Sequence, residues 1–220
     1  MKIDILTIFP NMFSALEQSL IGKAQKKGLV KINIHNLRNY TVDKHHSVDD
    51  RPFGGGPGMV MRVDIIDQAL KDLKSKTCKT ILLSPQGQVF NQKKAQELKK
   101  LKHLILICGH YEGFDERVRE HLVDEEVSIG DYVLTGGEIP ALAVVDTVVR
   151  LLPGVIGKKE SLEFESFSGS TLDYPEYTRP KVYKNWSVPK VLLSGNHKQI
   201  KSWRKKKSLE KTKSKRPDLL

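Results

Sequence analysis

The sequence predicts a parallel α/β sheet followed by a small, basic helical domain. Short apolar segments with strand character alternate with amphipathic helical segments from residue 2 to residue 152. This order is typical of parallel sheets with right-handed crossovers. Glycine-rich turns follow two of the strand segments. After Gly154 the composition becomes polar and then lysine-rich, which indicates a second domain.

The first elements are two strands separated by a helix. Residues 2–9 favour a strand, which ends at Pro10. Apolar residues recur at helical spacing across residues 12–27, and Gly28 can end that helix in the left-handed conformation. Residues 30–36 alternate between apolar and polar side chains and predict the second strand.

Residues 37–61 show little regular pattern, and a loop of this length inside a domain is usually functional or disordered. His45, His46 and neighbouring aspartates could bind a metal, but the spacing matches no common ligand framework, so we expect no permanent metal site. The glycine run at 54–58 matches neither the dinucleotide nor the phosphate-loop pattern. The glycine run instead indicates a backbone that bends tightly and lies close to a bulky group.

The alternation continues to residue 152. The predicted elements are, in order, a helix at 64–75, a strand at 79–83, a helix at 91–101, a strand at 104–108, a short charged helix, a strand at 126–129 and a helix at 138–152. The loops after the last three strands are residues 84–87, 109–113 and 129–134. All three contain glycine, and the second and third also contain aromatic and acidic residues. Ligands bind beyond the carboxyl ends of parallel strands, and glycine lets the backbone approach them closely. We therefore expect a cofactor pocket built largely from backbone.

Positive charge is concentrated at the C-terminal end. The net charge is +11, and residues 197–220 hold ten Lys and Arg against two acidic residues, whereas the first 196 residues carry only +3. Such a basic end predicts a polyanionic partner, most simply nucleic acid. A solvated, lysine-rich helix face explains the charge alone equally well.

Cysteine use and apolar runs favour a cytoplasmic location. Cys78 and Cys108 form no C-x-x-C motif, which suits free thiols in a reducing compartment. No apolar run approaches the roughly 18 residues of a membrane helix, so no membrane association is expected. Asp4 and Pro10 interrupt the apolar start, which we interpret as a strand and not a signal peptide.

A series of motifs spans the whole chain in a fixed order. They are I-D-I-L-T-I-F-P at the start, R-P-F-G-G-G-P-G-M (51–59), L-S-P-Q-G (83–87), C-G-H-Y-E-G-F-D-E-R-V (108–118), S-I-G-D-Y-V-L-T-G-G-E-I-P-A (128–141), D-Y-P-E-Y-T-R-P (173–180), V-P-K-V-L-L-S-G-N-H (188–197) and R-P-D-L-L (216–220). In this order they closely resemble the bacterial tRNA (guanine-N1)-methyltransferase family. The resemblance implies methyl transfer from S-adenosylmethionine to N1 of the guanine immediately 3′ of the anticodon in tRNA.

The resemblance also implies a knotted fold of the SPOUT type. Residues 1–156 would form an α/β domain with a deep trefoil knot that binds S-adenosylmethionine in a bent shape. Residues 157–168 would be an interdomain linker, and residues 169–220 a basic helical domain that binds the tRNA anticodon stem-loop. The enzyme would be a homodimer with shared active sites. The residue pattern alone predicts an unknotted doubly wound sheet, because threaded loops are rare.

The family's cofactor residues map onto the three loops. The resemblance assigns to cofactor binding Ser84, Pro85, Gln86, Gly87, Gly109, Tyr111, Glu112, Ser128, Ile129, Gly130, Asp131, Tyr132, Val133, Leu134, Gly136, Gly137 and Pro140. Backbone groups in such turns can hydrogen-bond the adenine edge while apolar side chains cover its faces. Core packing is the alternative explanation for Ile129, Leu134 and Pro140.

The resemblance assigns the catalytic roles to residues around the linker. Glu165 takes the position of the general base, where the family form has Asp, and Asp173 is a second acidic candidate. Arg150 would stabilise charge on guanine O6. Without the resemblance, we would interpret Glu165 as a solvated linker carboxylate. We would interpret Arg150 as a charge that complements a helix dipole. Magnesium is compatible with tRNA folding or charge compensation, although no ligand cluster indicates it.

Two alternatives remain open at this point. The first is a knotted methyltransferase with another RNA target, such as a ribose 2′-OH or ribosomal RNA. The second is a non-catalytic, basic RNA-binding scaffold that retains the pocket. A Rossmann-type methyltransferase is disfavoured, because Phe9-Pro10-Asn11 follows the first strand where a glycine-rich turn would be needed.

Overall fold

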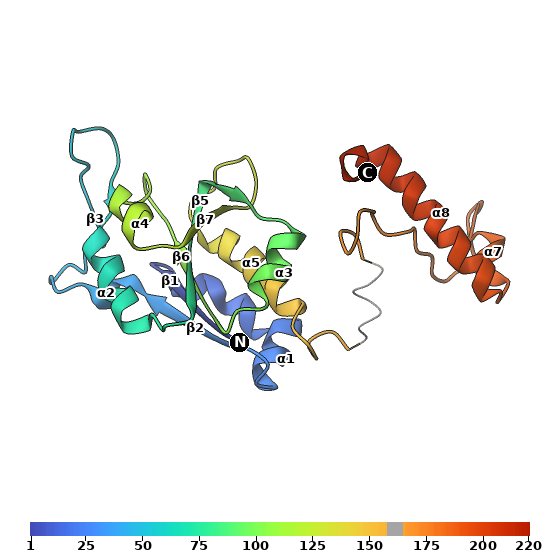
Figure 1. Ribbon diagram of the computed structural model, residues 1–220, viewed down its shortest axis with the longest axis horizontal. Coiled ribbons are helices and arrows are strands. Elements are labelled where there is room, and N and C mark those ends of the chain that lie inside the picture. The colour runs from blue at the N-terminus through green and yellow to red at the C-terminus, as the bar shows by residue number, and fades with distance from the viewer. Residues whose placement is uncertain (158–164) are drawn as a thin grey trace. The chain divides into compact units, whose positions relative to one another are not determined.

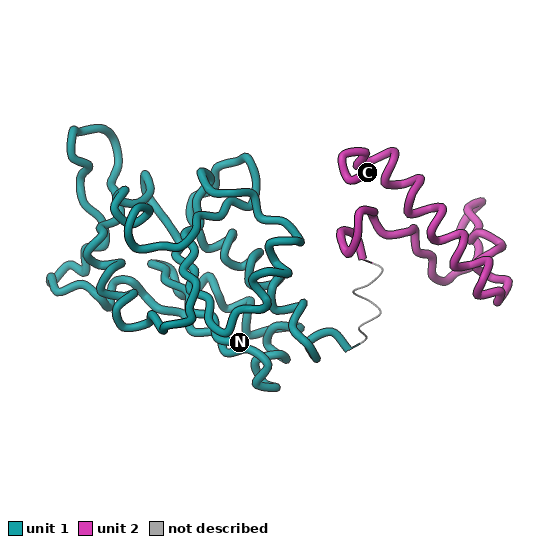
Figure 2. Tube along the Cα trace, in the orientation of Figure 1, with its two compact units in different colours: residues 1–157 teal, residues 158–220 magenta. Residues whose placement is uncertain are grey.

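The computed structural model describes residues 1–157 and 165–220. The chain divides into two compact units, residues 1–157 and 158–220 (Figure 2). Part of the predicted linker, residues 158–164, lies outside the described residues. The first unit contains the sheet and the second is built mainly from helices (Figure 1).

The first unit contains a five-stranded parallel sheet, which confirms the predicted α/β class. Its strands lie in the order β2-β1-β6-β5-β7, and every neighbouring pair is parallel. Leu6 on β1 and Leu82 on β5 both pair with Ile107 on β6, between them. The strands are β1 (Lys2–Thr7), β2 (Lys31–Asn36), β5 (Cys78–Val89), β6 (His103–Cys108) and β7 (Glu125–Ser128).

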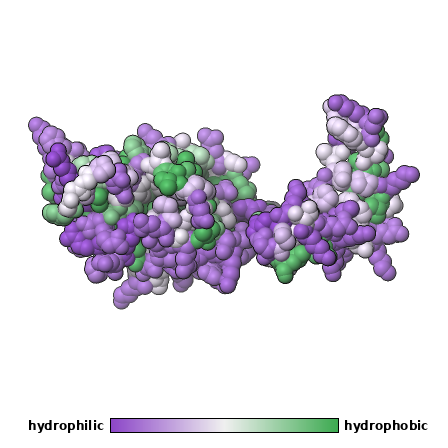
Figure 3. Space-filling view, turned by 90° about the horizontal axis from the view of Figure 1, so that it is seen from above, coloured by the Kyte–Doolittle hydropathy of each residue, from purple (hydrophilic) through white to green (hydrophobic). Residues whose placement is uncertain are grey.

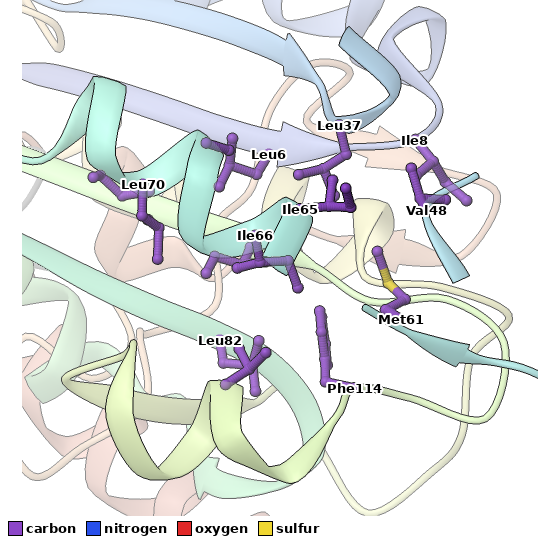
Figure 4. Packing of buried hydrophobic residues seen from close by; sticks show 14 residues of the cluster. Leu6, Ile8, Leu37, Val48, Met61, Ile65, Ile66, Leu70, Leu82 and Phe114 are labelled. Atoms are coloured by element: carbon purple, nitrogen blue, oxygen red, sulfur yellow. The ribbon is translucent and has the colours of Figure 1, made fainter. Parts of the chain in front are cut away.

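Helices cover both faces of the sheet. Figure 1 shows α2 (Val63–Leu73) and α4 (Glu116–His121) on one side. On the other side lie α1 (Ser19–Lys26), α3 (Gln92–Leu98) and α5 (Glu138–Arg150). Successive strand residues point to opposite faces, so each strand contributes to two cores. The core under α2 contains Leu6, Leu82, Ile66, Leu70, Phe114 and Met61 (Figure 4).

The predicted helix at 12–27 is divided in two. A 3₁₀ helix, η1 (Pro10–Glu17), precedes α1, and Ser19, the first residue of α1, has a positive φ of 51°. Gly22 lies so close to the end of η1 that a Cβ at this position would overlap the Glu17 carbonyl oxygen. The periodicity of apolar residues continues across both helices, which explains why one helix was predicted.

Strand β5 also differs from the prediction, because it continues through the expected turn at 84–87 to Val89. Leu83 and Gln88 both pair with Val127, so the residues between them form a bulge in the strand. Bulges are common next to active sites because they redirect side chains. In the irregular segment, η2 (Leu37–Tyr40) is followed by β3 (Asp49–Asp50), which pairs with β4 (Val60–Met61) at the base of the glycine loop.

The second unit is organised around the long helix α8 (His197–Lys215). The Asn196 side chain caps this helix by accepting a hydrogen bond from the Gln199 N–H at 3.1 Å. An extended segment lies along it, where the Leu172 N–H donates to buried Thr212 Oγ1 at 2.9 Å. The other elements are α7 (Lys190–Leu193), η3 (Pro217–Leu219) and a hairpin of β8 (Val182–Tyr183) and β9 (Trp186–Ser187). No helix in the described parts of the chain is long and apolar enough to cross a membrane.

A buried carboxylate connects three neighbouring strands of the sheet, β2, β1 and β6. Asp4 on β1 is fully buried and accepts hydrogen bonds from Asn33 at 2.7 Å and His103 at 2.6 Å. His35 and the Lys2 ammonium lie 2.9 and 2.6 Å from the same carboxylate. Burial alone would raise the pKa of Asp4, but these partners together lower it well below its usual value.

We predict that Asp4→Asn destabilises the fold at neutral pH. The amide keeps the shape but loses charge-assisted hydrogen bonds, which are worth about 1.5–3 kcal/mol. Because the pKa of Asp4 is lowered in the folded state, this stabilisation is present above the unfolded pKa of about 3.9 and is lost as the pH falls below it. Urea unfolding of both proteins at pH 7 and pH 3 measures this. An equal difference at the two pH values would contradict the assignment.

Candidate functional site

A small cavity lies at the carboxyl end of β7 and beside the bulge of β5, at the edge of the sheet where ligands bind in open parallel sheets. It is lined mainly by the first and third predicted loops: Ser84, Pro85, Ser128, Ile129, Gly130, Tyr132, Leu134, Gly136, Gly137 and Pro140. Two further lining residues, Leu83 and Val127, were not predicted. Each is the last buried apolar residue of its strand, so the position where burial along a strand ends is the signal that identifies them.

Other residues predicted for cofactor binding lie outside this cavity lining. They are Gln86, Gly87, Gly109, Tyr111, Glu112, Asp131 and Val133. Gly87 has a packing role, because a Cβ there would lie 2.5 Å from the Glu126 carbonyl carbon on β7. Its missing side chain lets the bulge of β5 approach the neighbouring strand.

The second loop, residues 109–113, packs against the glycine loop. The Glu112 N–H donates to the Met59 carbonyl at 3.0 Å, and the Met61 N–H donates to the Gly113 carbonyl at 2.8 Å. The Glu112 side chain fills the space beside Gly58. A Cβ on Gly58 would lie 2.8 Å from Cδ of Glu112. The end of the glycine-rich segment therefore packs against the second loop, whereas a Cβ on Gly54, Gly55 or Gly56 would meet nothing within 4 Å.

The third loop is held by its own short-range hydrogen bonds. Ser128 Oγ donates to the Gly130 carbonyl at 2.9 Å and accepts from the Gly130 N–H at 3.1 Å. Gly130 has φ of 151°, and the ring of Tyr132 packs against it where a side chain would stand. Tyr132, Val133 and Leu134 are all exposed, so few packing contacts hold this part of the loop.

A buried carboxylate joins the second and third loops. Glu138, at the start of α5, is 1% exposed. Its Oε2 lies 2.7 Å from His110 Nε2 on the second loop, and its Oε1 accepts a hydrogen bond from Thr7 Oγ1 on β1 at 2.6 Å. A Cβ on Gly136 would lie 2.6 Å from the same Oε2, and one on Gly137 would lie 2.7 Å from Cys108 Cα. The two glycines let α5 begin directly against β6.

The cavity volume is about 60 Å³. Sites that enclose small ligands usually measure roughly 300–1,000 Å³. A ligand as large as a nucleoside is therefore accommodated only if part of the lining moves outward. The exposed third loop is the lining segment with the weakest packing, whereas the Glu138 link fixes the base of the site.

The predicted catalytic residues belong to different units. Arg150 is the last residue of α5 in the first unit and is partly buried. Glu165 and Asp173 lie in the second unit, where both line a cavity of about 510 Å³. The same cavity contains Lys201, Arg204 and Lys205 of α8.

Asp173 is held by an ion pair on α8. Lys211 Nζ lies 2.6 Å from Asp173 Oδ1, and the Ser166 hydroxyl donates to the same oxygen at 3.0 Å. Lys211 and Ser166 lower the pKa of Asp173 despite its partial burial. The carbonyl of Glu165 accepts a hydrogen bond from Ser168 Oγ at 2.7 Å. These contacts fold residues 165–173 into a turn that rests on α8.

A third cavity, of about 800 Å³, lies beside the β3–β4 pair and the first residues of α2 and α4. Asp50 and Arg51 line it together with Phe114 and Arg117, and neither lines the small cavity at the strand ends. Within residues 1–157 and 165–220, no three His, Cys, Asp or Glu side chains gather as a metal site would require.

The whole chain matches one family of known proteins. The family model described as tRNA (Guanine-1)-methyltransferase TrmD matches residues 1–220. The chain is also 58% identical to the tRNA (guanine-N(1)-)-methyltransferase of Carboxydothermus hydrogenoformans, over all of this chain and 87% of that protein.

Two further relatives have the same description. The protein of Dictyoglomus turgidum is 57% identical over all of this chain and 90% of its own length. The protein of Staphylococcus epidermidis is 53% identical over all of this chain and 91% of its own length. The similarity therefore includes both units.

We predict that Gly136→Ala weakens binding of S-adenosylmethionine. The new methyl group would overlap the His110 ring and displace Glu138, and such overpacking costs about 1–3 kcal/mol, equivalent to roughly five- to 150-fold in affinity. Titration calorimetry measures the affinity. Gly157→Ala is the matched control, because a Cβ there meets nothing within 4 Å. Unchanged affinity in Gly136→Ala would contradict this role for the start of α5.

Proposed function

The chain belongs to the tRNA (guanine-N1)-methyltransferase family, and from this we propose how its residues divide the reaction. The enzyme methylates N1 of guanine in tRNA. In our proposal, the strand-end cavity of the first unit binds S-adenosylmethionine, Glu165 is the general base and Arg150 stabilises charge on guanine O6. The target is the guanine immediately 3′ of the anticodon.

The observation that carries the proposal is the continuous match of both units to one family, combined with a cavity at the expected strand ends. The lining suits an adenosyl group. Leu134, Ile129 and Pro140 offer apolar surface to the faces of a base, and the glycines leave backbone N–H and C=O groups accessible to its edge. When bound there, S-adenosylmethionine supplies an electrophilic methyl group.

Guanine N1 carries a proton near neutral pH, and methylation requires the electron pair that forms the N1–H bond. The Glu165 carboxylate takes this proton. As the N1–H bond breaks, negative charge moves toward O6, where the Arg150 guanidinium donates a hydrogen bond. The base and the cation therefore act on adjacent atoms of the same ring.

Asp173 fits a supporting role better than the role of the base. Its carboxylate is engaged by Lys211 and Ser166, and its pKa is lowered. A lower pKa makes a carboxylate a weaker proton acceptor. We therefore assign proton removal to Glu165, and we assign to Asp173 the positioning of the turn that carries Glu165.

We further propose that the enzyme is a homodimer in which each active site takes Arg150 from one subunit and Glu165 from the other. The two residues belong to separate units of the chain, which is compatible with such sharing. The proposal includes a deep trefoil knot formed by the segments around the second and third loops. The basic second unit would bind the phosphates of the tRNA anticodon stem-loop.

The target base is tested with two tRNA transcripts that carry either guanine or adenine immediately 3′ of the anticodon. We expect methyl transfer from radiolabelled S-adenosylmethionine to the guanine transcript alone. Equal labelling of both transcripts would place the target elsewhere, and labelling of neither, with cofactor still bound, would contradict the proposed specificity.

We expect Arg150→Ala and Glu165→Ala each to reduce single-turnover methylation by about 10²–10³-fold or more, while S-adenosylmethionine affinity stays within a few-fold. Removing either group takes away an interaction made in the transition state, so the rate falls and cofactor binding does not. Glu165→Asp is the conservative control and should retain substantial activity. Either alanine variant acting at a near wild-type rate would exclude the proposed role.

Mixing the two inactive variants tests the shared active site. After subunit exchange, a heterodimer of Arg150→Ala and Glu165→Ala contains one site with both residues intact. We expect about a quarter of wild-type activity if subunits pair at random in a symmetric dimer. If each site were built within one subunit, mixing would restore nothing.

A further inference from the structure

The β8–β9 hairpin of the second unit carries two exposed aromatic rings around a lysine. Tyr183 pairs with Trp186 across the hairpin, and their ring centroids lie 5.9 Å apart at 50°. The side chains are 56% and 68% exposed. Lys184 Nζ lies 5.6 Å from the centroid of each ring, within the range of a cation–π contact.

These two rings are not needed to fill the core of the unit. Trp203, on α8, is partly buried and its ring contacts that of Tyr177, so this pair anchors α8 to the extended segment. Aromatic side chains normally contribute large buried areas. A pair left exposed on a short hairpin, beside a lysine, is instead typical of a recognition surface.

The charge around the hairpin identifies the kind of partner. Residues 165–220 carry fourteen Lys and Arg against five acidic residues, a net charge of +9. No Asp or Glu lies between Tyr177 and Leu209, so the sequence around the hairpin is entirely basic or neutral. Figure 3 shows that the second unit presents a mainly hydrophilic surface with small hydrophobic areas in that view.

A partner for this surface must combine negative charge with flat, accessible rings. Unpaired nucleotides do so, because an unstacked base offers its face to an aromatic side chain while the adjacent phosphate pairs with lysine. Base–aromatic stacking strengthens binding by roughly five- to 150-fold per base. An RNA duplex offers the phosphates but keeps its bases stacked within the helix.

We propose that the β8–β9 hairpin stacks on an unpaired base of the tRNA substrate, with Trp186 and Tyr183 as the platform and Lys184 beside the neighbouring phosphate. This inference rests on the proposed function for the identity of the RNA. It adds a contact that recognises a splayed nucleotide in addition to the electrostatic contacts of α8.

The test compares binding of two RNAs to Trp186→Ala by fluorescence anisotropy at one salt concentration. The probes are a full tRNA transcript and a blunt RNA duplex with the same number of phosphates. We expect about tenfold weaker binding of the tRNA and unchanged binding of the duplex. Trp186→Phe, which keeps a ring, should stay within about threefold of wild type. Leu193→Ala removes another exposed apolar side chain from the same unit and serves as the matched control.

A second measurement reports the contact directly. Trp186 and Trp203 are the two tryptophans of the chain, so in Trp203→Phe the emission comes from Trp186 alone. Stacking on a base should quench this emission when tRNA is added and leave it unchanged with the duplex. Equal quenching by both RNAs, or none with tRNA, would overturn the proposal.

The remaining outcomes are also decisive. Equal loss of affinity for both RNAs in Trp186→Ala, or the same loss in Trp186→Phe, would indicate a structural role. A changed oligomeric state with unchanged tRNA binding would assign the hairpin to contact between copies of the chain. These assays measure binding and not methylation. Selectively weaker tRNA binding by Trp186→Ala would therefore support the stacking proposal even if neither transcript in the guanine–adenine comparison were methylated.

Discussion

The buried Glu138 carboxylate at the start of α5 is the interaction on which the candidate site depends. It contacts Thr7 at the end of β1 and His110 on the second loop, so three segments distant in the sequence meet at one group. This meeting requires Gly136 and Gly137, because a Cβ at either position would collide with the second loop or with β6. The rigid base of the cavity therefore follows from one polar contact and two missing side chains, while the exposed third loop remains able to move outward.

In the proposed mechanism, the two catalytic groups come from elements that are held in different ways. Arg150 ends a helix whose other face is deeply buried, so its backbone position is set by the first unit. Glu165 lies on a turn that rests on α8 through the Asp173–Lys211 ion pair and the Leu172 backbone. The proposed base is thus positioned by the second unit, to which we also assign tRNA binding. This arrangement would couple proton removal to correct seating of the tRNA.

Sequence patterns predicted the sheet because apolar alternation and strand–helix order depend on local periodicity. They failed where the periodicity of apolar residues continues although the backbone conformation changes. This happens at Ser19, whose positive φ divides the predicted helix, and in the bulge of β5. Leu83 and Val127 were missed because a cavity-lining residue at a strand end resembles any core residue. The Asp4 cluster and the Glu138 link could not be found from sequence, because their partners are brought together only by the tertiary fold.

Hydrogen–deuterium exchange with and without S-adenosylmethionine tests the central claim most directly. If the three loops of the first unit form the cofactor site, adding the cofactor should slow exchange at residues 83–88, 109–113 and 128–137. Exchange in residues 165–220 should remain unchanged in the absence of tRNA. Protection concentrated instead around Asp50 to Asp64, or along the cavity beside α8, would contradict the account.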